Sequence, residues 1–336
     1  MKRETGARLQ QSQWHTEPAT KGKIYLAPYH DYTWRGVYMY TLTLKRGVPA
    51  FSTVSGTPHL PVVTLSDFGR AAEQLILAQP SFFPCHIIDY VLMPDHIHLL
   101  FAVTRTLDRH VGHEMGALEG AIKRALLSLH PHLADTWRDV KIFDGNRPHD
   151  RIVKDDGQLQ TCQRYVRDNP RRLLVRRLYP DLFRVYNHLR VGDREMAAYG
   201  NIFLLRDFQK KAVRIHRRWS QGELEAYIDE CLAVTANGGV LVSPWIHPWE
   251  RDIRDRAIAL GGRIVTVRAD GFRDRFKPCA SEFALCQQGR LLLLAPWSDR
   301  PADTVTRREA LSLNDLAAAL AAVNADTPMS LAPHKR

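Results

Sequence analysis

The order of hydrophobic and polar positions predicts an antiparallel sheet covered by helices in the first half of the chain. Runs of β-branched and aromatic residues indicate strands, and apolar residues three and four positions apart indicate amphipathic helices. In chain order, the predicted elements are strands at 37–44, 82–93 and 96–103, and helices at 66–78, 108–129, 157–168 and 171–178. Pro94 turns the last two strands into a central hairpin, and Pro170 is expected to separate the last two helices. We assign this α+β domain to residues 35–185.

The second half alternates short buried strands with helices, a pattern typical of a smaller parallel α/β domain. The expected elements are strands at 240–243, 264–268 and 290–295, and helices at 223–233, 249–260 and 307–323. Glycines punctuate the pattern, and Gly261-Gly262 is expected to end one helix. We therefore expect a Rossmann-like domain over residues 223–325. The remaining segments are an N-terminal extension (1–34), a basic linker (186–222) and a tail (326–336).

Composition fits a globular protein of two domains. The chain has 336 residues, of which 45% are hydrophobic and 25% are charged. It contains no run of about 18 apolar residues, the length that a membrane helix needs, and its polar N-terminus lacks the apolar core of a signal peptide. The five cysteines show no CxxC spacing, which argues against a disulfide framework or a cysteine-rich zinc site. We expect a cytoplasmic protein, not bound to a membrane, with reduced and mostly buried thiols.

The net charge of +11 is concentrated in one segment. Residues 161–220 hold 15 Lys and Arg against 5 Asp and Glu, whereas residues 221–336 hold 14 against 15. Such a density of basic residues favours a polyanionic partner, with nucleic acid first. Arginine dominates, and its planar guanidinium suits phosphate. The alternative is a solvated helix face whose charges pair with acidic residues elsewhere.

Two histidines separated by one residue begin the second strand of the predicted hairpin, in the run Met-Pro-Asp95-His96-Ile97-His98. Side chains alternate across a strand, so His96 and His98 lie on one face while Ile97 faces the core. Two imidazoles fixed on a strand can bind one divalent ion. Taken alone, such a pattern is more often two ordinary polar residues on the exposed face of a sheet.

A tyrosine and an asparagine lie one turn apart in the helix predicted before Pro170. Tyr165 and Asn169 are four positions apart and share one helix face. A tyrosine hydroxyl can attack a phosphate, and an amide oxygen one turn away can complete a metal site. In the alternative, Tyr165 is a core aromatic whose hydroxyl reaches the surface, and Asn169 caps the helix that is expected from Pro170.

Together the two motifs resemble those of the HUH single-tyrosine transposases, and most of all the REP-associated tyrosine transposases, over about residues 35–185. HUH denotes two histidines flanking a hydrophobic residue. Members of that family usually read Met-Pro-Asn-His, whereas this chain has Asp95, which can add negative charge near a metal. The single well-placed tyrosine fits the single-tyrosine class.

The resemblance implies a metal-dependent endonuclease and strand transferase acting on single-stranded DNA, at hairpins of the REP type. It implies that His96, His98 and Asn169 hold Mg²⁺ or Mn²⁺. It also implies that Tyr165 attacks the scissile phosphate, forming a 5′-phosphotyrosine and releasing a 3′-hydroxyl. The arginines expected to bind DNA are Arg164, Arg167, Arg171, Arg172, Arg176 and Arg177. Both a monomer and a homodimer are compatible with the sequence.

The predicted C-terminal domain is similar, more weakly, to the Rossmann-like domains of the DNA-processing protein A and lysine-decarboxylase-like group. Its loop after the strand at 240–243 would face a helix N-terminus, where anions bind readily. The candidates for an anion or nucleotide site are Ser243, Glu250 and Lys277, but GxGxxG and P-loop motifs are absent. The alternative is a structural domain that holds DNA or a partner and has no ligand site of its own. For the whole chain, two other functions remain open: a non-cleaving DNA- or RNA-binding protein, and a nucleotide-binding protein acting through this domain.

Overall fold

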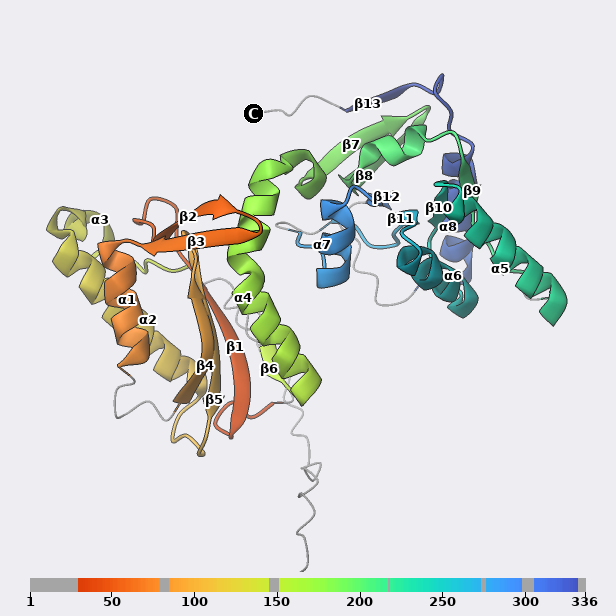
Figure 1. The fold of residues 1–336 in the computed structure, drawn as a ribbon. Helices are drawn as coiled ribbons and strands as arrows, with labels where there is room; N and C mark the ends of the chain where they lie inside the picture. The colour runs from red at the N-terminus through yellow and green to blue at the C-terminus, as the bar shows by residue number, and fades with distance from the viewer. Residues whose placement is uncertain are drawn as a thin grey trace, which may run out of the picture. The chain divides into compact units, whose positions relative to one another are not determined.

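The protein consists of two compact units, Met1–Leu174 and Val175–Arg336 (Figure 1). Each is described by itself. A computed structural model describes residues 30–78, 85–144, 151–216, 218–272, 276–297 and 305–331. Most of the predicted N-terminal extension, the first residues of the strand predicted at 82–93 and the last five residues of the predicted tail lie outside these ranges.

The first unit is built on a four-stranded antiparallel sheet in the order β4-β5-β1-β6, with a separate β2–β3 hairpin. Its elements are β1 (Gly36–Thr43), β2 (Ser52–Thr57), β3 (Leu60–Leu65), α1 (Asp67–Leu77), β4 (Cys85–Leu92), β5 (His96–Val103), α2 (Val111–Leu129), η1 (Pro131–Leu133), α3 (Ala134–Trp137), β6 (Arg151–Val153) and the start of α4 (Asp156–Leu178). The β4–β5 hairpin lies in the sheet as predicted. The hydrophobic pattern does not predict the β2–β3 hairpin.

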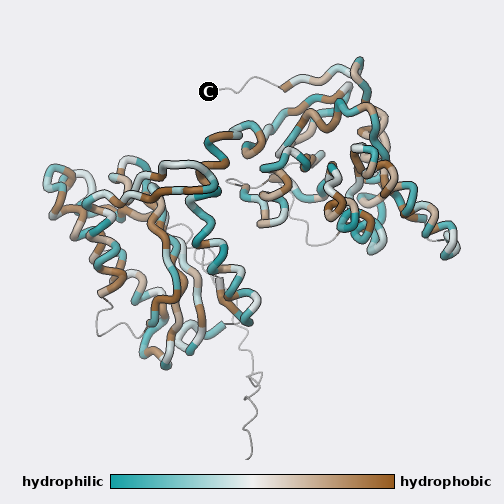
Figure 2. The backbone as a smooth tube through the Cα atoms, in the orientation of Figure 1, coloured by the Kyte–Doolittle hydropathy of each residue, from teal (hydrophilic) through white to brown (hydrophobic). Residues whose placement is uncertain are grey.

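Alternation along β5 separates the apolar core from the opposite face of the sheet. Ile97, Leu99 and Phe101 are at most 1% exposed and pack with side chains of α1 and α2. Helices α1 and α2 lie on one side of the sheet and α4 lies on the other (Figure 1). The even-numbered positions His96 and His98 therefore face α4. Much of α4 is hydrophilic in Figure 2, as expected for a helix with an exposed side.

Helix α4 continues through Pro170, so the predicted break into two helices is wrong. Pro170 has no N–H and forfeits the hydrogen bond to the carbonyl of Val166. The side chain of Asn169 donates from Nδ2 to the carbonyl of Tyr165 at 3.0 Å. On either side of the proline the helix is anchored by buried Val166 and by Leu174, which packs against the β2–β3 hairpin. Tertiary packing of this kind contributes more to helix stability than local propensity does.

The second unit is a seven-stranded mixed sheet in the order β13-β7-β8-β12-β11-β10-β9. Strands β9 to β12 run parallel, whereas β7, β8 and β13 pair antiparallel. Its elements are η2 (Pro180–Phe183), β7 (Val185–Val191), β8 (Arg194–Gly200), η3 (Ile202–Arg206), β9 (Lys210–Ala212), α5 (Gln221–Ala236), β10 (Val240–Ser243), α6 (Pro248–Ala259), β11 (Arg263–Val267), α7 (Ala280–Gln287), β12 (Leu291–Ala295), α8 (Arg307–Ala321) and β13 (Met329–Leu331). The predicted fold class, an α+β domain followed by an α/β domain with parallel strands, is confirmed. The second domain is not the smaller, purely parallel one that the sequence predicts, because β7, β8 and β13 extend its sheet to seven strands.

Helices cover both faces of the parallel strands. Val240 and Val242 of β10 belong to the core that includes α8, whereas Leu241 between them packs with α5, α6 and α7. Strands β9 to β12 cross the sheet in chain order. Right-handed crossovers between such strands place the connecting helices on one face, which explains the shared layer of α5, α6 and α7.

The segment 186–222, predicted as a linker, instead contributes strands to the second sheet. Strands β7 and β8 form a hairpin with the two-residue loop Gly192-Asp193. Gly192 has φ +61°, the left-handed region that such a turn favours. Strand β8 then pairs with β12, and β9 pairs with β10. Within the predicted tail, β13 pairs with β7. The unit boundary falls inside α4, after Leu174, and not at residue 185.

All five cysteines are free thiols, and only Cys279 is exposed. Burial raises the pKa of the Cys231 thiol to about 11 and that of Cys85 and Cys286 to about 12. The expectation of mostly buried thiols is confirmed. Within the ranges that the structure describes, no helix is both long enough and apolar enough to cross a membrane.

Candidate active site

His96 and His98 lie side by side on the face of β5 that α4 covers. Their ring centroids are 4.6 Å apart, and the rings are inclined by 72°. His98 is 2% exposed, and 15% of the His96 side chain is exposed. Because β5 lies between two paired strands, its backbone holds both rings on a rigid support.

Each imidazole has a partner at Nδ1. Nδ1 of His96 lies 2.7 Å from Asp95 Oδ1, and Nδ1 of His98 lies 2.8 Å from Thr41 Oγ1 on the neighbouring strand β1. A carboxylate only accepts hydrogen bonds, so Nδ1 of His96 carries a proton and, in the neutral ring, Nε2 carries the lone pair. That Nε2 atom is buried and has no hydrogen-bond partner among the described residues. A metal ion is a partner that fits such a nitrogen.

Helix α4 brings Tyr165 against His98. The centroids of the two rings are 5.2 Å apart, and Tyr165 is half-buried. Arg172, two turns later on the same helix, has its guanidinium carbon 5.4 Å from the centroid of the Tyr165 ring. Arg172 is only 6% exposed. Tyr165 therefore contacts both His98 and a buried positive charge.

The available donors fit a divalent ion whose coordination is completed by oxygen ligands. No three His, Cys, Asp or Glu side chains come together in the part of the chain that the structure describes, so within that part a third protein ligand would be of another type. Asn169 is 8% exposed, and because its Nδ2 donates to the Tyr165 carbonyl, Oδ1 is the end of the amide that can bind a cation. Two imidazoles and one amide oxygen leave positions for the phosphate and water oxygens that Mg²⁺ and Mn²⁺ prefer.

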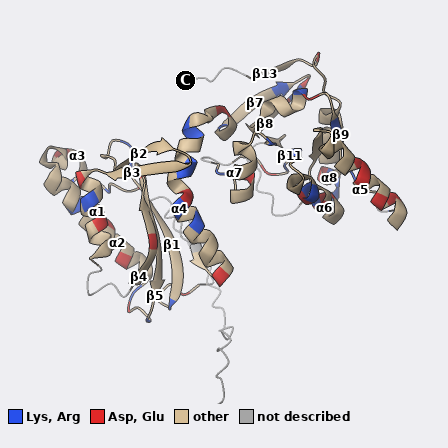
Figure 3. Ribbon diagram, in the orientation of Figure 1, with Lys and Arg blue, Asp and Glu red and all other residues tan. Residues whose placement is uncertain are grey.

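The six arginines predicted to bind DNA differ in exposure and partners. Figure 3 shows basic residues along α4. Arg172 is buried beside Tyr165, Arg171 donates from Nη2 to Asp168 at 3.0 Å, and Arg176 lies 5.6 Å from the centroid of the Phe283 ring. The exposed members are Arg164, Arg167 and Arg177. Since a DNA backbone is contacted by exposed charges, these three are the best placed of the six to meet it, and DNA binding by the set stays a prediction.

An ion pair ties α4 to the edge strand β4. Nε of Arg167 donates to Oδ2 of Asp89 at 2.6 Å, and only 15% of the Asp89 side chain is exposed. A bulge in β4 shifts the register between Ile87 and Asp89, so Ile87 packs on the core while Asp89 faces α4. Neither Asp89 nor Thr41 is found by sequence reasoning, because no fixed spacing connects them to either motif.

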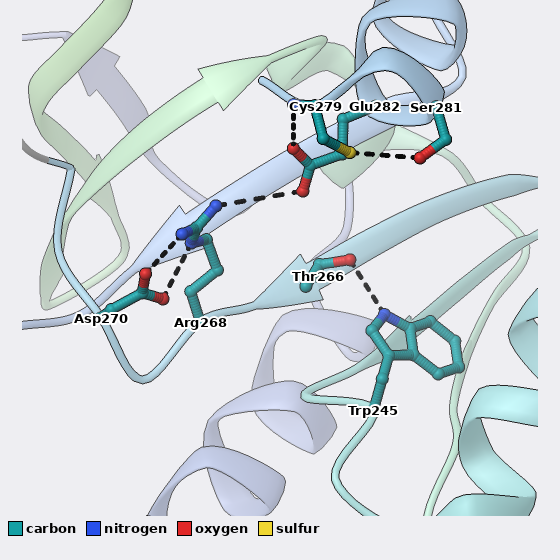
Figure 4. Close-up of polar contacts among 7 residues, drawn as sticks. All are labelled: Trp245, Thr266, Arg268, Asp270, Cys279, Ser281 and Glu282. Atoms are coloured by element: carbon teal, nitrogen blue, oxygen red, sulfur yellow. Dashed lines mark hydrogen bonds and ion pairs between the residues drawn. The ribbon is translucent and has the colours of Figure 1, made fainter. Parts of the chain in front are cut away.

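In the second unit, two of the three predicted site residues make internal contacts. Ser243 is fully buried at the end of β10 and accepts a hydrogen bond from the backbone N–H of Trp245 at 3.1 Å. Trp245 in turn donates from its indole to Thr266 at 2.9 Å (Figure 4). Glu250 is 2% exposed and accepts from three backbone N–H groups, those of Ile215, Ile246 and His247. Lys277 is exposed before α7.

These contacts give Glu250 a role in building the N-terminus of α6, where it completes a capping box. A carboxylate at that position disfavours an anion there, because it already neutralises the positive end of the helix dipole. The anion or nucleotide site suggested by the sequence at Ser243, Glu250 and Lys277 stays a prediction.

Arg268, directly after β11, contacts two carboxylates, and the second of them belongs to α7. Nε of Arg268 donates to Asp270 at 3.0 Å, and its Nη1 lies 4.0 Å from Glu282 (Figure 4). The guanidinium carbon lies 5.5 Å and 5.1 Å from the ring centroids of Phe272 and Phe276. Because its charge is compensated and its side chain is mostly buried, Arg268 stabilises this loop and does not present a charge to a ligand.

No protein-family model matches the chain, and no curated protein matches it in sequence. Three solved structures are similar to parts of it. A REP-associated tyrosine transposase bound to a REP hairpin has a TM-score of 0.29 and 15% identity, over 43% of this chain and 73% of that one. A candidate transposase from Deinococcus radiodurans R1 has a TM-score of 0.27 and 16% identity, over 45% and 97%. DNA processing protein A from Helicobacter pylori, a single-stranded DNA-binding protein, has a TM-score of 0.28 and 18% identity, over 38% and 57%.

Proposed function

We propose that the first unit cleaves and rejoins single-stranded DNA through Tyr165. The observation that supports this most strongly is the contact between the rings of Tyr165 and His98, whose centroids are 5.2 Å apart. It joins a nucleophile on α4 to a pair of imidazoles on β5, with the buried Arg172 over the tyrosine ring. The resemblance of the two motifs to those of REP-associated tyrosine transposases suggests hairpin DNA as the substrate.

In the proposed reaction, the hydroxyl oxygen of Tyr165 attacks the phosphorus of a phosphodiester. A bond from phosphorus to the tyrosine oxygen forms as the bond to the 3′ oxygen breaks. The hydroxyl proton is lost to solvent, and the departing 3′ oxygen takes up a proton. Attack by a 3′-hydroxyl on the phosphotyrosine reverses the step, rejoins a strand and regenerates Tyr165 without ATP.

Each residue of the site has a defined task in this proposal. His96, His98 and Asn169 would hold Mg²⁺ or Mn²⁺, which supplies Lewis-acid polarisation of the phosphate when bound. Arg172 stabilises the negative charge on the tyrosine oxygen and on the phosphate, and its burial strengthens that interaction. Exposed arginines such as Arg164 contact the backbone of the flanking DNA.

The test uses the whole chain, Mn²⁺ and hairpin DNA labelled at either end, followed by denaturing electrophoresis. We expect a 3′ label to migrate with the protein, and a 5′ label to leave on a shorter strand that ends in a 3′-hydroxyl. Tyr165→Phe is expected to abolish the covalent band, whereas Tyr179→Phe, at an exposed tyrosine just after α4, is expected to retain it. His96→Ala and His98→Ala are expected to abolish it as well.

Failure to form an adduct with any of a broad set of hairpins, while those hairpins still bind, would favour the non-cleaving nucleic-acid-binding alternative. The nucleotide-binding alternative gains no support from Ser243 and Glu250, whose polar atoms are engaged with backbone groups. An increase in the Tm of the whole chain with one class of nucleotide would support the nucleotide-binding alternative.

A further inference from the structure

We propose that Asp95 is a positioning residue that orients His96 and raises the affinity of the site for its divalent ion. The inference rests on the proposed function, because it requires a metal at His96 and His98. Asp95 lies in the turn between β4 and β5, and backbone hydrogen bonds hold this turn on both sides of it. The carbonyl of Asp95 accepts from the N–H of Leu44 at 2.8 Å, and the N–H of Met93 donates to the carbonyl of His96 at 2.8 Å.

The side chain of Asp95 contacts the ring of His96. Its Oδ1 lies 2.7 Å from Nδ1 of His96, the length of a charge-assisted hydrogen bond. The side chain of Asp95 is 76% exposed, whereas that of His96 is 15% exposed. An ionised carboxylate at the surface therefore holds a mostly buried ring from its outer edge.

Three consequences for His96 follow from this contact. The proton is fixed on Nδ1, so the lone pair is on Nε2, which is buried and has no hydrogen-bond partner among the described residues. Rotation of the ring is restrained. The negative charge of Asp95 also attracts the cation that Nε2 would bind through the ring, and loss of such a partner typically costs 10–100-fold in metal affinity.

His98 is supported differently. Its Nδ1 meets the hydroxyl of Thr41, a neutral group, at 2.8 Å. Of the two imidazoles, only His96 is backed by a carboxylate in the contacts at Nδ1. The two ligands are thus unequal, and the charge of Asp95 distinguishes this turn from one that carries asparagine at the same position.

The experiment measures Mn²⁺ binding to the whole chain without DNA, from the electron paramagnetic resonance signal of free Mn²⁺ during a titration. Asp95→Ala is expected to weaken binding by about 10–100-fold. Asp95→Asn is expected to lose less, since the amide oxygen can still accept from Nδ1 but carries no charge. Asp139→Asn, which removes the same charge from an exposed position of the same unit, is the matched control and is expected to bind as the unaltered protein does.

Other outcomes separate this inference from the proposed function. Binding that His96→Ala abolishes but Asp95→Ala leaves unchanged would overturn the role of Asp95 and leave the metal centre standing. Absence of any His96-dependent binding in the unaltered protein would overturn both. Because the Asp95 side chain is mostly exposed, its variants are expected to keep the Tm of the parent, and a large drop in Tm would assign the loss of affinity to unfolding and overturn the positioning role.

Discussion

Arg172 is the buried positive charge beside the proposed nucleophile. Its guanidinium carbon lies 5.4 Å from the centroid of the Tyr165 ring, and the residue is 6% exposed. A donor that is already in place where negative charge develops contributes about 10²–10³-fold to a rate. We therefore expect Arg172→Gln to slow adduct formation by about 10²-fold in a single-turnover assay, with little change in DNA affinity.

The matched control for this prediction is Arg164→Gln, on an exposed position of the same helix. It is expected to weaken DNA binding and to leave the rate at saturating DNA unchanged. Arg172→Lys, which keeps the charge but not the planar fork, should recover part of the rate. Equal rates for Arg172→Gln and Arg164→Gln would contradict a role for Arg172 in the reaction.

Pairing decides how much an exposed arginine contributes to DNA binding. Arg164 and Arg167 are both exposed on α4, but Arg167 is paired with Asp89 at 2.6 Å. Each phosphate neutralised on a single strand changes the slope of log K against log salt by about 0.7. We expect Arg164→Gln to flatten that slope by about 0.7 and Arg167→Gln by clearly less. Fluorescence anisotropy over a salt series measures both, and identical slopes for the two variants would refute the argument.

The groups proposed to react are visible in the sequence, whereas the residues that hold them are not. His96 and His98 follow from strand alternation, and Tyr165 and Asn169 from helical spacing. Thr41 and Asp89 reach the site from neighbouring strands, so only the pairing of β1 with β5 and the bulge in β4 reveal them. Spacing along the chain carries no information about contacts across a sheet.

At the scale of elements, α2 contains glycines that differ in what surrounds them. A Cβ at Gly116 would meet nothing within 4 Å, whereas a Cβ at Gly112 would lie 2.9 Å from Nδ1 of His110. That Nδ1 accepts the N–H of Gly112 and caps the helix. Alanine in place of glycine inside a helix is worth about 0.5–1 kcal/mol where it fits.

We therefore expect Gly116→Ala to raise the free energy of unfolding by about 0.5–1 kcal/mol, measured by urea denaturation with an unchanged m-value. Gly112→Ala is expected to give no gain or a loss, because its methyl group disturbs the cap at His110. A similar gain in both variants would show that the cap contributes little.

Pro170 is a position at which the sequence predicts the wrong element boundary. A proline inside a helical pattern favours a break, because the missing N–H and the ring both disfavour a continuous helix. The structure keeps α4 intact because buried side chains on both sides of the proline anchor it, and these are contacts that no local pattern contains. The other helices predicted before residue 130 begin and end within a few residues of the prediction, since capping and amphipathic spacing are local properties.

At the scale of the whole molecule, residues 186–222 contain strands of the second sheet. Their many charged residues favour the interpretation of this segment as a linker. Arg190 and Arg194 occupy exposed positions of β7 and β8, while Leu189, Val191 and Met196 are buried. The Gly192-Asp193 loop between these alternating runs is a hairpin signal that sequence reasoning could have used. The pairing of β8 with β12, about ninety residues further along, is not a local property of either strand.

This topology predicts which fragments of the chain fold. A fragment that begins at residue 223, the boundary expected from sequence, lacks β7, β8 and β9 and leaves β10 and β12 without their outer neighbours. Unpaired strand edges and an uncovered apolar face favour aggregation. A fragment that begins at Val175 keeps the whole sheet, together with the contact between Phe183 and Phe283, whose ring centroids are 4.7 Å apart.

We expect only the fragment from Val175 to unfold cooperatively in circular dichroism. Cooperative unfolding of the fragment from residue 223 at the same temperature would show that the parallel strands form a domain without β7, β8 and β9.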